Sequence, residues 1–200
     1  MSRLLVAGGL VAGILIVAVG VISIVIGANG HSVVRHDLKR EDIVGTPDMK
    51  KGGNPPGPGL SDIPTCDVAN KPIRTGSQAR CFASYMRIHA LEATGGKTYA
   101  NMDRFVASNQ RGAKPGNPNT TNDEKAAATD PKSHQPVENP KRQVWVTETA
   151  LSTALNTSYF AERVSLFSLI IGIVLVVAGI GLLVLTLGAL RPALMRPAGA

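Results

Sequence analysis

Among the residues of this 200-residue chain that could do chemistry, the four histidines are the first to consider. His31 and His36 are five positions apart, whereas two ligands on one helix face stand three or four apart. His134 lies in a polar tract, so only His89 falls in a segment with a helical pattern. His89 could form a pH-sensitive contact with lipid, a partner or a ligand. It could equally be a helix-end histidine that donates to a loop carbonyl.

The run Gly96-Lys97-Thr98 ends like a phosphate-binding loop. That motif needs a glycine five positions before Gly96, where the chain has Leu91, and it should follow a strand. We therefore expect the end of one helix and the start of another. The candidate interaction residues of the resulting corner are His89, Lys97, Tyr99 and Asp103.

The chain has two cysteines, Cys66 and Cys81. Their spacing does not suit a redox pair, and two thiols are too few for a structural zinc site. In an oxidising compartment they would form a disulfide that closes a loop of about sixteen residues, worth roughly 3 kcal/mol. On the cytoplasmic side they would remain reduced thiols.

Two long apolar runs determine how the histidines, the corner residues and the cysteines lie relative to a membrane. Residues 164–190 contain no charge and would form a helix of roughly 40 Å, longer than the ~30 Å hydrocarbon core requires. Residues 4–28 form a similar run, which is longer than the apolar core of a signal peptide. We expect both to be transmembrane helices, with the first retained as an anchor.

Glycines recur along both runs at small-x-x-x-small and seven-residue spacing. Small residues on one face let helix backbones approach closely, which substitutes for the hydrophobic drive that lipid does not supply. The candidate helix-packing residues are Gly9, Gly13, Gly20, Gly172 and Gly179. They could pack the two helices as an antiparallel hairpin, which we favour, or form a dimerisation face.

The connecting segment, residues 29–163, is polar and too poor in apolar side chains to fold throughout. Helical periodicity predicts an ordered part at about 65–105, with a helix over 75–96 and a short helix after it. A second ordered part at 144–163 should carry a helix that starts at about 147 and continues through the membrane run to 190 without a break. Composition predicts disorder at about 45–64 and 109–143.

The formal net charge is +7, but the basic residues are scattered among fourteen acidic ones. Nucleic-acid binding is therefore not expected. Arg3, Arg191 and Arg196 in the tails favour cytoplasmic termini, with residues 191–200 as a cytoplasmic tail. The segment 29–163 would then be extracytoplasmic, although the basic residues just after the first span argue weakly against this.

The run from Arg87 to Arg104 contains His-Ala-x-x-Ala-x-Gly-Gly-Lys-Thr-Tyr. It resembles the signature of a family of small two-span actinobacterial membrane proteins. The resemblance implies an N-terminal span, an extracytoplasmic helix that ends at this motif, and a polar helix that enters the second span. Some members are labelled aromatic-ring-opening dioxygenases. Such an enzyme needs a closed histidine and carboxylate iron site, which these residues do not provide.

We therefore expect an all-α membrane protein: a two-helix transmembrane hairpin with a small helical extracytoplasmic element and long disordered linkers. The expected function is a non-enzymatic subunit of a plasma-membrane or cell-envelope complex, without a cofactor. Its partners would be the lipid bilayer and either another membrane protein or a second copy of the chain. The alternative is a membrane protein that binds lipid or a small ligand.

Overall fold

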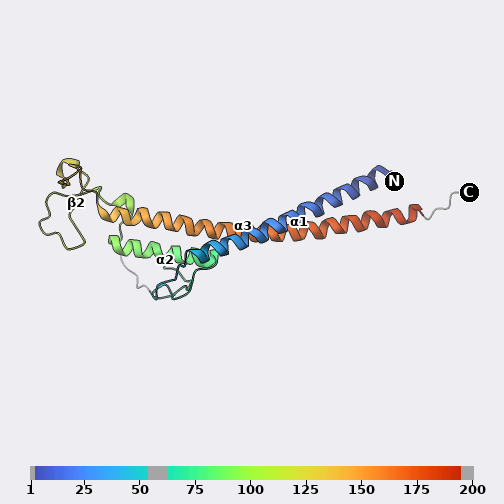
Figure 1. The fold of residues 1–200 in the computed structure, drawn as a ribbon, viewed down its shortest axis with the longest axis horizontal. Coiled ribbons are helices and arrows are strands. Elements are labelled where there is room, and N and C mark those ends of the chain that lie inside the picture. Colours follow the sequence, from blue (N-terminus) through green and yellow to red (C-terminus); the bar gives the residue numbers. More distant parts are fainter. Residues whose placement is uncertain (1–2, 54–62, 195–200) are drawn as a thin grey trace, which may run out of the picture. The chain divides into compact units, whose positions relative to one another are not determined.

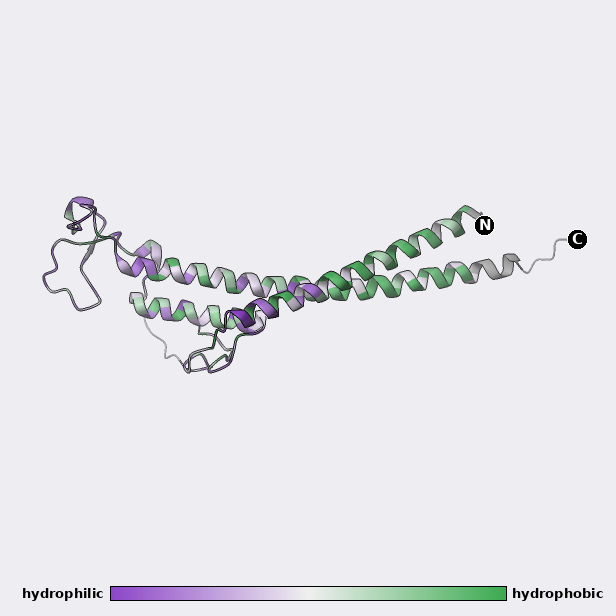
Figure 2. Cartoon of the chain, in the orientation of Figure 1, coloured by the Kyte–Doolittle hydropathy of each residue, from purple (hydrophilic) through white to green (hydrophobic). Residues whose placement is uncertain are grey.

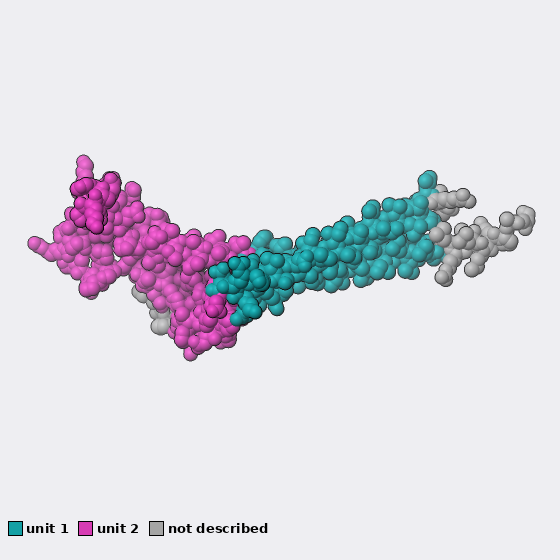
Figure 3. All heavy atoms as spheres, in the orientation of Figure 1, with its two compact units in different colours: residues 1–41, 74–76, 158–200 teal, residues 42–73, 77–157 magenta. Residues whose placement is uncertain are grey.

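The computed structural model of the chain describes residues 3–53 and 63–194, and it is mostly helical (Figure 1). The chain forms two compact units (Figure 3). The paired-helix unit comprises Met1–Glu41, Arg74–Gly76 and Ser158–Ala200, and the corner unit comprises Asp42–Ile73 and Ser77–Thr157. Helix α3, Pro140–Leu194, contributes to both units.

In the paired-helix unit, α1 (Arg3–Arg40) packs antiparallel to the C-terminal part of α3. A Cβ atom on Gly20 would lie 2.8 Å from the carbonyl oxygen of Gly172, and a Cβ on Gly172 would lie 2.7 Å from that of Gly20. Gly13 likewise faces Leu183 and Gly179, and Gly9 faces Thr186. The candidate packing glycines therefore lie on the contact between the two helices of one chain.

Adding a methyl group at this contact should destabilise the helix pair. For Gly20→Ala and Gly172→Ala we expect a loss of about 1–3 kcal/mol, because the new Cβ meets backbone atoms that have little room to move. The measurement is unfolding of the purified protein in detergent micelles. Gly8→Ala and Gly181→Ala are matched controls, because a Cβ at either position meets nothing within 4 Å. Equal stability of all four variants would contradict the packing.

The outer faces of α1 and of the C-terminal part of α3 are apolar (Figure 2). Large aliphatic side chains remain well exposed, including Ile14 at 59%, Val177 at 66% and Leu185 at 74%. By length and composition, Leu4–Arg40 and Pro140–Gly188 could each cross a membrane. Exposed apolar surface of this extent is compatible with insertion into lipid.

In the corner unit, α2 (Gly76–Thr94) lies beside the N-terminal part of α3 (Figure 1). The predicted helix over 75–96 is confirmed, and it ends where Gly95 and Gly96 take positive φ angles of 68° and 78°. The short helix predicted after it is only a 3-10 turn, Tyr99–Asn101. β1 (Phe105–Val106) follows instead of further helix.

Helix α3 is continuous through both predicted segments, as expected, but it begins at Pro140 and ends at Leu194. The Asn139 side chain accepts a hydrogen bond from the Lys141 amide at 3.1 Å, which caps the first turn. Proline at the first helical position costs no intrahelical hydrogen bond. The expected cytoplasmic tail is thus helical as far as Leu194, and residues 195–200 lie outside the described part.

The tract 109–143, predicted to be disordered, has defined structure instead. β1 pairs antiparallel with β2 (Thr120–Thr121), a 3-10 turn spans Glu124–Ala126, and Val106 donates its amide to the Val137 carbonyl at 2.9 Å. Polar side chains satisfy the backbone: the Asp130 carboxylate accepts from the amides of Lys132 and Ser133. Amino-acid composition does not reveal these local hydrogen bonds, so it led to a prediction of disorder. The described part of the chain is therefore mostly helical, with a small two-stranded sheet in addition.

The predicted linker at 45–64 is likewise ordered over 45–53. Gly45 donates its amide to the Lys71 carbonyl at 3.0 Å, and Val68 donates to the Met49 carbonyl at 2.9 Å. Met49 is fully buried. This segment is thus part of the corner unit, whereas residues 54–62 lie outside the described part.

Candidate interaction site

The disulfide between Cys66 and Cys81 is present, which confirms the sequence prediction. It ties the segment before α2 to the first turns of that helix, with the two Cα atoms 6.1 Å apart. Only Cys66 is exposed, because the side chain of Cys81 is buried. The disulfide therefore fixes how the preceding loop lies on α2.

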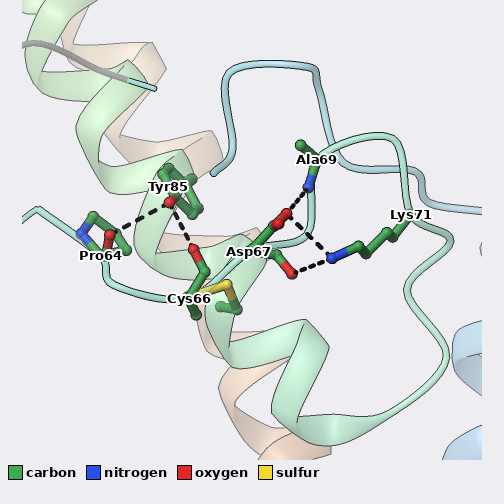
Figure 4. Close-up of polar contacts among 7 residues, drawn as sticks. Pro64, Cys66, Asp67, Ala69, Lys71 and Tyr85 are labelled. Atoms are coloured by element: carbon green, nitrogen blue, oxygen red, sulfur yellow. Dashed lines mark hydrogen bonds and ion pairs between the residues drawn. A yellow bond between two sulfur atoms is a disulfide. The ribbon is translucent and has the colours of Figure 1, made fainter. Parts of the chain in front are cut away.

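One turn further along α2, Tyr85 completes this attachment (Figure 4). Its ring is fully buried, and its hydroxyl donates to the carbonyl of Cys66 at 2.9 Å. Burial raises the pKa of Tyr85, and the nearby carboxylates Asp67 and Asp48 raise it further. The sequence reading did not identify Tyr85, although it is the tyrosine within the predicted helix.

His89 pairs with Asp48, which lies forty-one positions earlier in the loop 45–53. The Nε2 atom of His89 lies 2.6 Å from a carboxylate oxygen of Asp48. Since an ionised carboxylate only accepts, Nε2 carries the proton and donates. A helix-end histidine bonded to a loop carbonyl was the alternative, but the partner is a carboxylate.

The surroundings of Asp48 favour its ionised form. A hydrogen bond with the Thr46 side chain, and then one with His89, lower the pKa of Asp48 from 3.8 to about 2. Because both side chains of the pair are more than a third exposed, at 36% for His89 and 38% for Asp48, solvent screens their interaction. The pair therefore locates the loop on α2 more than it stabilises the fold.

The lowered pKa of Asp48 predicts a small acid-dependent loss of stability. The contribution of ionised Asp48 to the free energy of unfolding is complete above about pH 5. It is lost as pH falls from about 4 through 2, because the carboxylate must then take up a proton. We expect Asp48→Asn to lose less than about 1 kcal/mol at pH 7 and to lack this acid dependence. Amide hydrogen exchange of α2 at pH 7, 4 and 2.5 measures it.

Glu92→Gln, at an exposed acid on the same helix, is the control and should behave like the wild type. The assignment to Asp48 is wrong if Asp48→Asn retains the wild-type loss of protection between pH 4 and 2.5.

Beyond the end of α2, the corner is closed by Trp145 of α3. Its indole N–H donates to the Lys97 carbonyl at 2.8 Å, and the Thr94 hydroxyl donates to the same carbonyl at 2.7 Å. The ring packs with Ala90, Leu91 and Met102 in a buried cluster. Lys97 therefore shapes the corner through its backbone.

The other two candidates have separate positions. Asp103 organises the loop that follows: its carboxylate accepts from the Thr120 hydroxyl at 2.7 Å and from the Asn122 amide at 2.8 Å. Tyr99 is stacked with Arg142, whose guanidinium carbon lies 4.0 Å from the ring centroid. Lys97 and Asp103 line one cavity of about 210 Å³, whereas Tyr99 and His89 line two others. The four candidates do not converge on one site.

His89 lies instead on a groove of about 500 Å³ between α2 and the first turns of α3. Its walls are largely aliphatic, and the lining residues are Met86, His89, Ala90, Ala93, Pro140, Gln143, Val144, Thr147 and Glu148. We call this surface the α2–α3 groove. Its volume falls within the range of small-molecule sites.

Glu148 is the most unusual residue of this groove, because its side chain is a carboxylate that is only 6% exposed. It accepts from the Ser152 hydroxyl at 2.7 Å and from the Thr149 hydroxyl at 3.4 Å. It also lines a second groove of about 330 Å³, together with Arg87. The sequence analysis did not identify Glu148. Its signal is that it is the one acidic residue in a row at helical spacing, which consists of Trp145, Glu148, Ser152 and Leu155.

No cluster of three histidine, cysteine or acidic side chains that could hold a metal ion occurs among residues 3–53 and 63–194. The Nδ1 atom of His31 lies 3.9 Å from Glu162, and that of His36 lies 3.6 Å from Asp37. His134 is exposed, in a turn at a positive φ of 55°.

No protein-family model matches this chain, and no curated protein or solved structure matches it either. The resemblance carried by the run from Arg87 to Arg104 stays a prediction.

Proposed function

We propose that this chain is a non-enzymatic integral membrane protein whose corner unit docks another protein of a membrane or cell-envelope complex. The α2–α3 groove carries the proposal. Its aliphatic walls offer apolar contact, while His89 and Glu148 supply polar groups that orient a bound segment. We also propose that the chain belongs to the family of small two-span membrane proteins that the run from Arg87 to Arg104 resembles.

The membrane hairpin belongs to this proposal. α1 and the C-terminal part of α3 would cross the plasma membrane as an antiparallel pair, with both termini in the cytoplasm and the corner unit outside. The apolar outer faces and the Cys66–Cys81 disulfide support this arrangement, because disulfides persist in oxidising compartments.

Thiol labelling in intact cells tests the topology. With a membrane-impermeant maleimide, we expect no labelling of Cys66 or Cys81 before reduction, and labelling of the exposed Cys66 after an impermeant reductant. Labelling that requires lysis but no reductant would place the corner unit in the cytoplasm.

Site-specific photo-crosslinking in cells tests the docking role. A benzophenone side chain at Ala93, which is exposed and lines the groove, should capture one defined protein. The same side chain at Glu92, which is exposed on α2 but does not line the groove, is the matched control and should not capture it. Capture of a second copy of this chain would identify a homo-oligomer. Equal products at both positions would contradict docking in the groove.

A second candidate function is binding of a lipid or another small apolar ligand, which the volume and aliphatic lining of the same groove favour. It predicts that the Ala93 photo-probe reacts with lipid and not with protein. Organic extraction of the purified protein should then release one lipid species in stoichiometric amount.

A further inference from the structure

A second cavity of the corner unit has charged side chains that the docking proposal does not use. It has a volume of about 480 Å³ and lies between β1 and the start of α3. It is lined by Tyr99, Arg104, Phe105, Glu138, Asn139, Pro140, Arg142, Gln143 and Val146. We call it the arginine cavity.

Both arginines of this cavity are held against aromatic rings. The guanidinium carbon of Arg142 lies 4.0 Å from the centroid of Tyr99, and that of Arg104 lies 5.0 Å from the centroid of Phe105. A guanidinium that lies over a ring face is attracted by the π electrons of the ring, and its N–H groups remain available to other acceptors. The rings therefore orient both cations without using their hydrogen-bond donors.

Those donors have no carboxylate to bind within the described part of the chain. Neither Arg104 nor Arg142 lies within 4 Å of an acidic oxygen there, although Glu138 lines the same cavity. Two cations and one anion thus share a single cavity without neutralising one another by contact. Such an arrangement matches a ligand that is negative at one end and donates hydrogen bonds at the other.

The segments that frame the cavity are joined by hydrogen bonds. Asn139 is buried, and it donates from its side chain to the Asp103 carbonyl at 2.9 Å and from its backbone to the Arg104 carbonyl at 2.9 Å. Phe105 and Glu138 are paired by an antiparallel bridge. Hence the segments that carry the two arginines and Glu138 are tied together, and little ordering remains to oppose binding.

We propose that the arginine cavity binds a small molecule with a phosphate group and a nearby amine or hydroxyl. Arg104 and Arg142 donate to the phosphate oxygens, with the bidentate geometry that a guanidinium offers. Glu138 accepts from the amine or hydroxyl at the other end. Exposed Tyr99 keeps Arg142 in the orientation that the phosphate requires.

Isothermal titration of the full-length protein in a maltoside detergent, with O-phosphoethanolamine as the probe, tests the site. We expect saturable binding, weakened at least tenfold by Arg142→Gln and by Arg104→Gln. Arg142→Lys should also weaken it several-fold, because lysine keeps the charge but not the paired donors. Arg111→Gln, at an exposed arginine outside the cavity, is the matched control and should leave the affinity unchanged.

Glu138→Gln separates recognition of the two ends of the ligand. It should weaken binding of O-phosphoethanolamine, whereas binding of inorganic phosphate should stay equal or become tighter, because a repelling carboxylate is lost. Glycerophosphoethanolamine, which has the phosphodiester of a lipid headgroup, is the third probe. Tighter binding of the diester would assign the site to a lipid headgroup, and tighter binding of the monoester to a soluble metabolite.

Three outcomes would overturn the proposal: no saturable binding of any probe at millimolar concentration, equal weakening by Arg111→Gln and Arg142→Gln, or no effect of Glu138→Gln on the preference between probes. Unchanged far-ultraviolet circular dichroism of each variant shows that the fold is retained. Failure here leaves the docking proposal intact, because Ala93 and the α2–α3 groove are tested separately.

Discussion

Replacing Trp145 with alanine should lower the free energy of unfolding of the corner unit by about 3–5 kcal/mol. The indole is only 4% exposed and fills the cluster with Ala90, Leu91 and Met102, so its removal leaves a cavity. The variant also loses the hydrogen bond to the Lys97 carbonyl, which closes the corner after α2. Because Trp145 is the only tryptophan, the variant has no tryptophan fluorescence with which to follow unfolding. Amide hydrogen exchange of α2 is therefore the suitable measurement.

Two further variants divide this effect into its parts. Trp145→Phe keeps most of the ring but not the N–H donor, and should cost about 1–3 kcal/mol. Val146→Ala, at the next position but 47% exposed, should stay within about 0.5 kcal/mol of the wild type. A loss for Val146→Ala as large as that for Trp145→Ala would show that the cluster does not hold the corner.

Removing the disulfide should be nearly as costly. For the double variant Cys66→Ser, Cys81→Ser we expect a loss of roughly 3 kcal/mol, because the unfolded chain regains the freedom of a loop of about sixteen residues. Hydrogen exchange should increase first in the segment before α2, where Tyr85 donates to the Cys66 carbonyl.

Reductant supplies the internal control. Treatment with a phosphine should bring the wild-type protein to the stability of the double serine variant, and it should leave that variant unchanged. A wild-type protein that keeps its full stability after complete reduction would show that the corner unit does not depend on the bridge.

The helices could be predicted from the sequence because each has a local signal. Apolar length indicated α1 and the C-terminal part of α3, and Gly95-Gly96 marked the end of α2, where both residues take positive φ. The start of α3 was placed seven positions too late, at 147 instead of Pro140. Asn139-Pro140 is a capping residue followed by a proline at the first helical position, and this signal could have located the start.

The ordered loops could not be predicted from composition, because their stability comes from hydrogen bonds that particular side chains make with the backbone and with one another. Asn119 donates its amide to the Gln110 side chain at 3.1 Å, and Asn122 donates to the Asp103 carboxylate at 2.8 Å. These pairs lie nine and nineteen positions apart. A tract rich in asparagine, threonine and proline has the same average polarity whether or not such pairs form.

The candidate site was predictable only in part, for a similar reason. His89 and the two cysteines stood out by residue type, but the partner of His89 lies in a loop that was taken for a linker. Glu148 and the two arginines are ordinary residues in sequence. They become notable only when folding buries the carboxylate and brings two stacked guanidinium groups to one cavity.

The glycine contact between α1 and α3 also limits how the lengths of these helices can change in evolution. One residue inserted between Gly20 and Gly27 would rotate one end of α1 by about 100° relative to the other, turning aliphatic side chains toward α3. An insertion of seven residues would rotate it by only about 20° from register. Length variation within this pair should therefore occur in units of seven residues, matched in both helices.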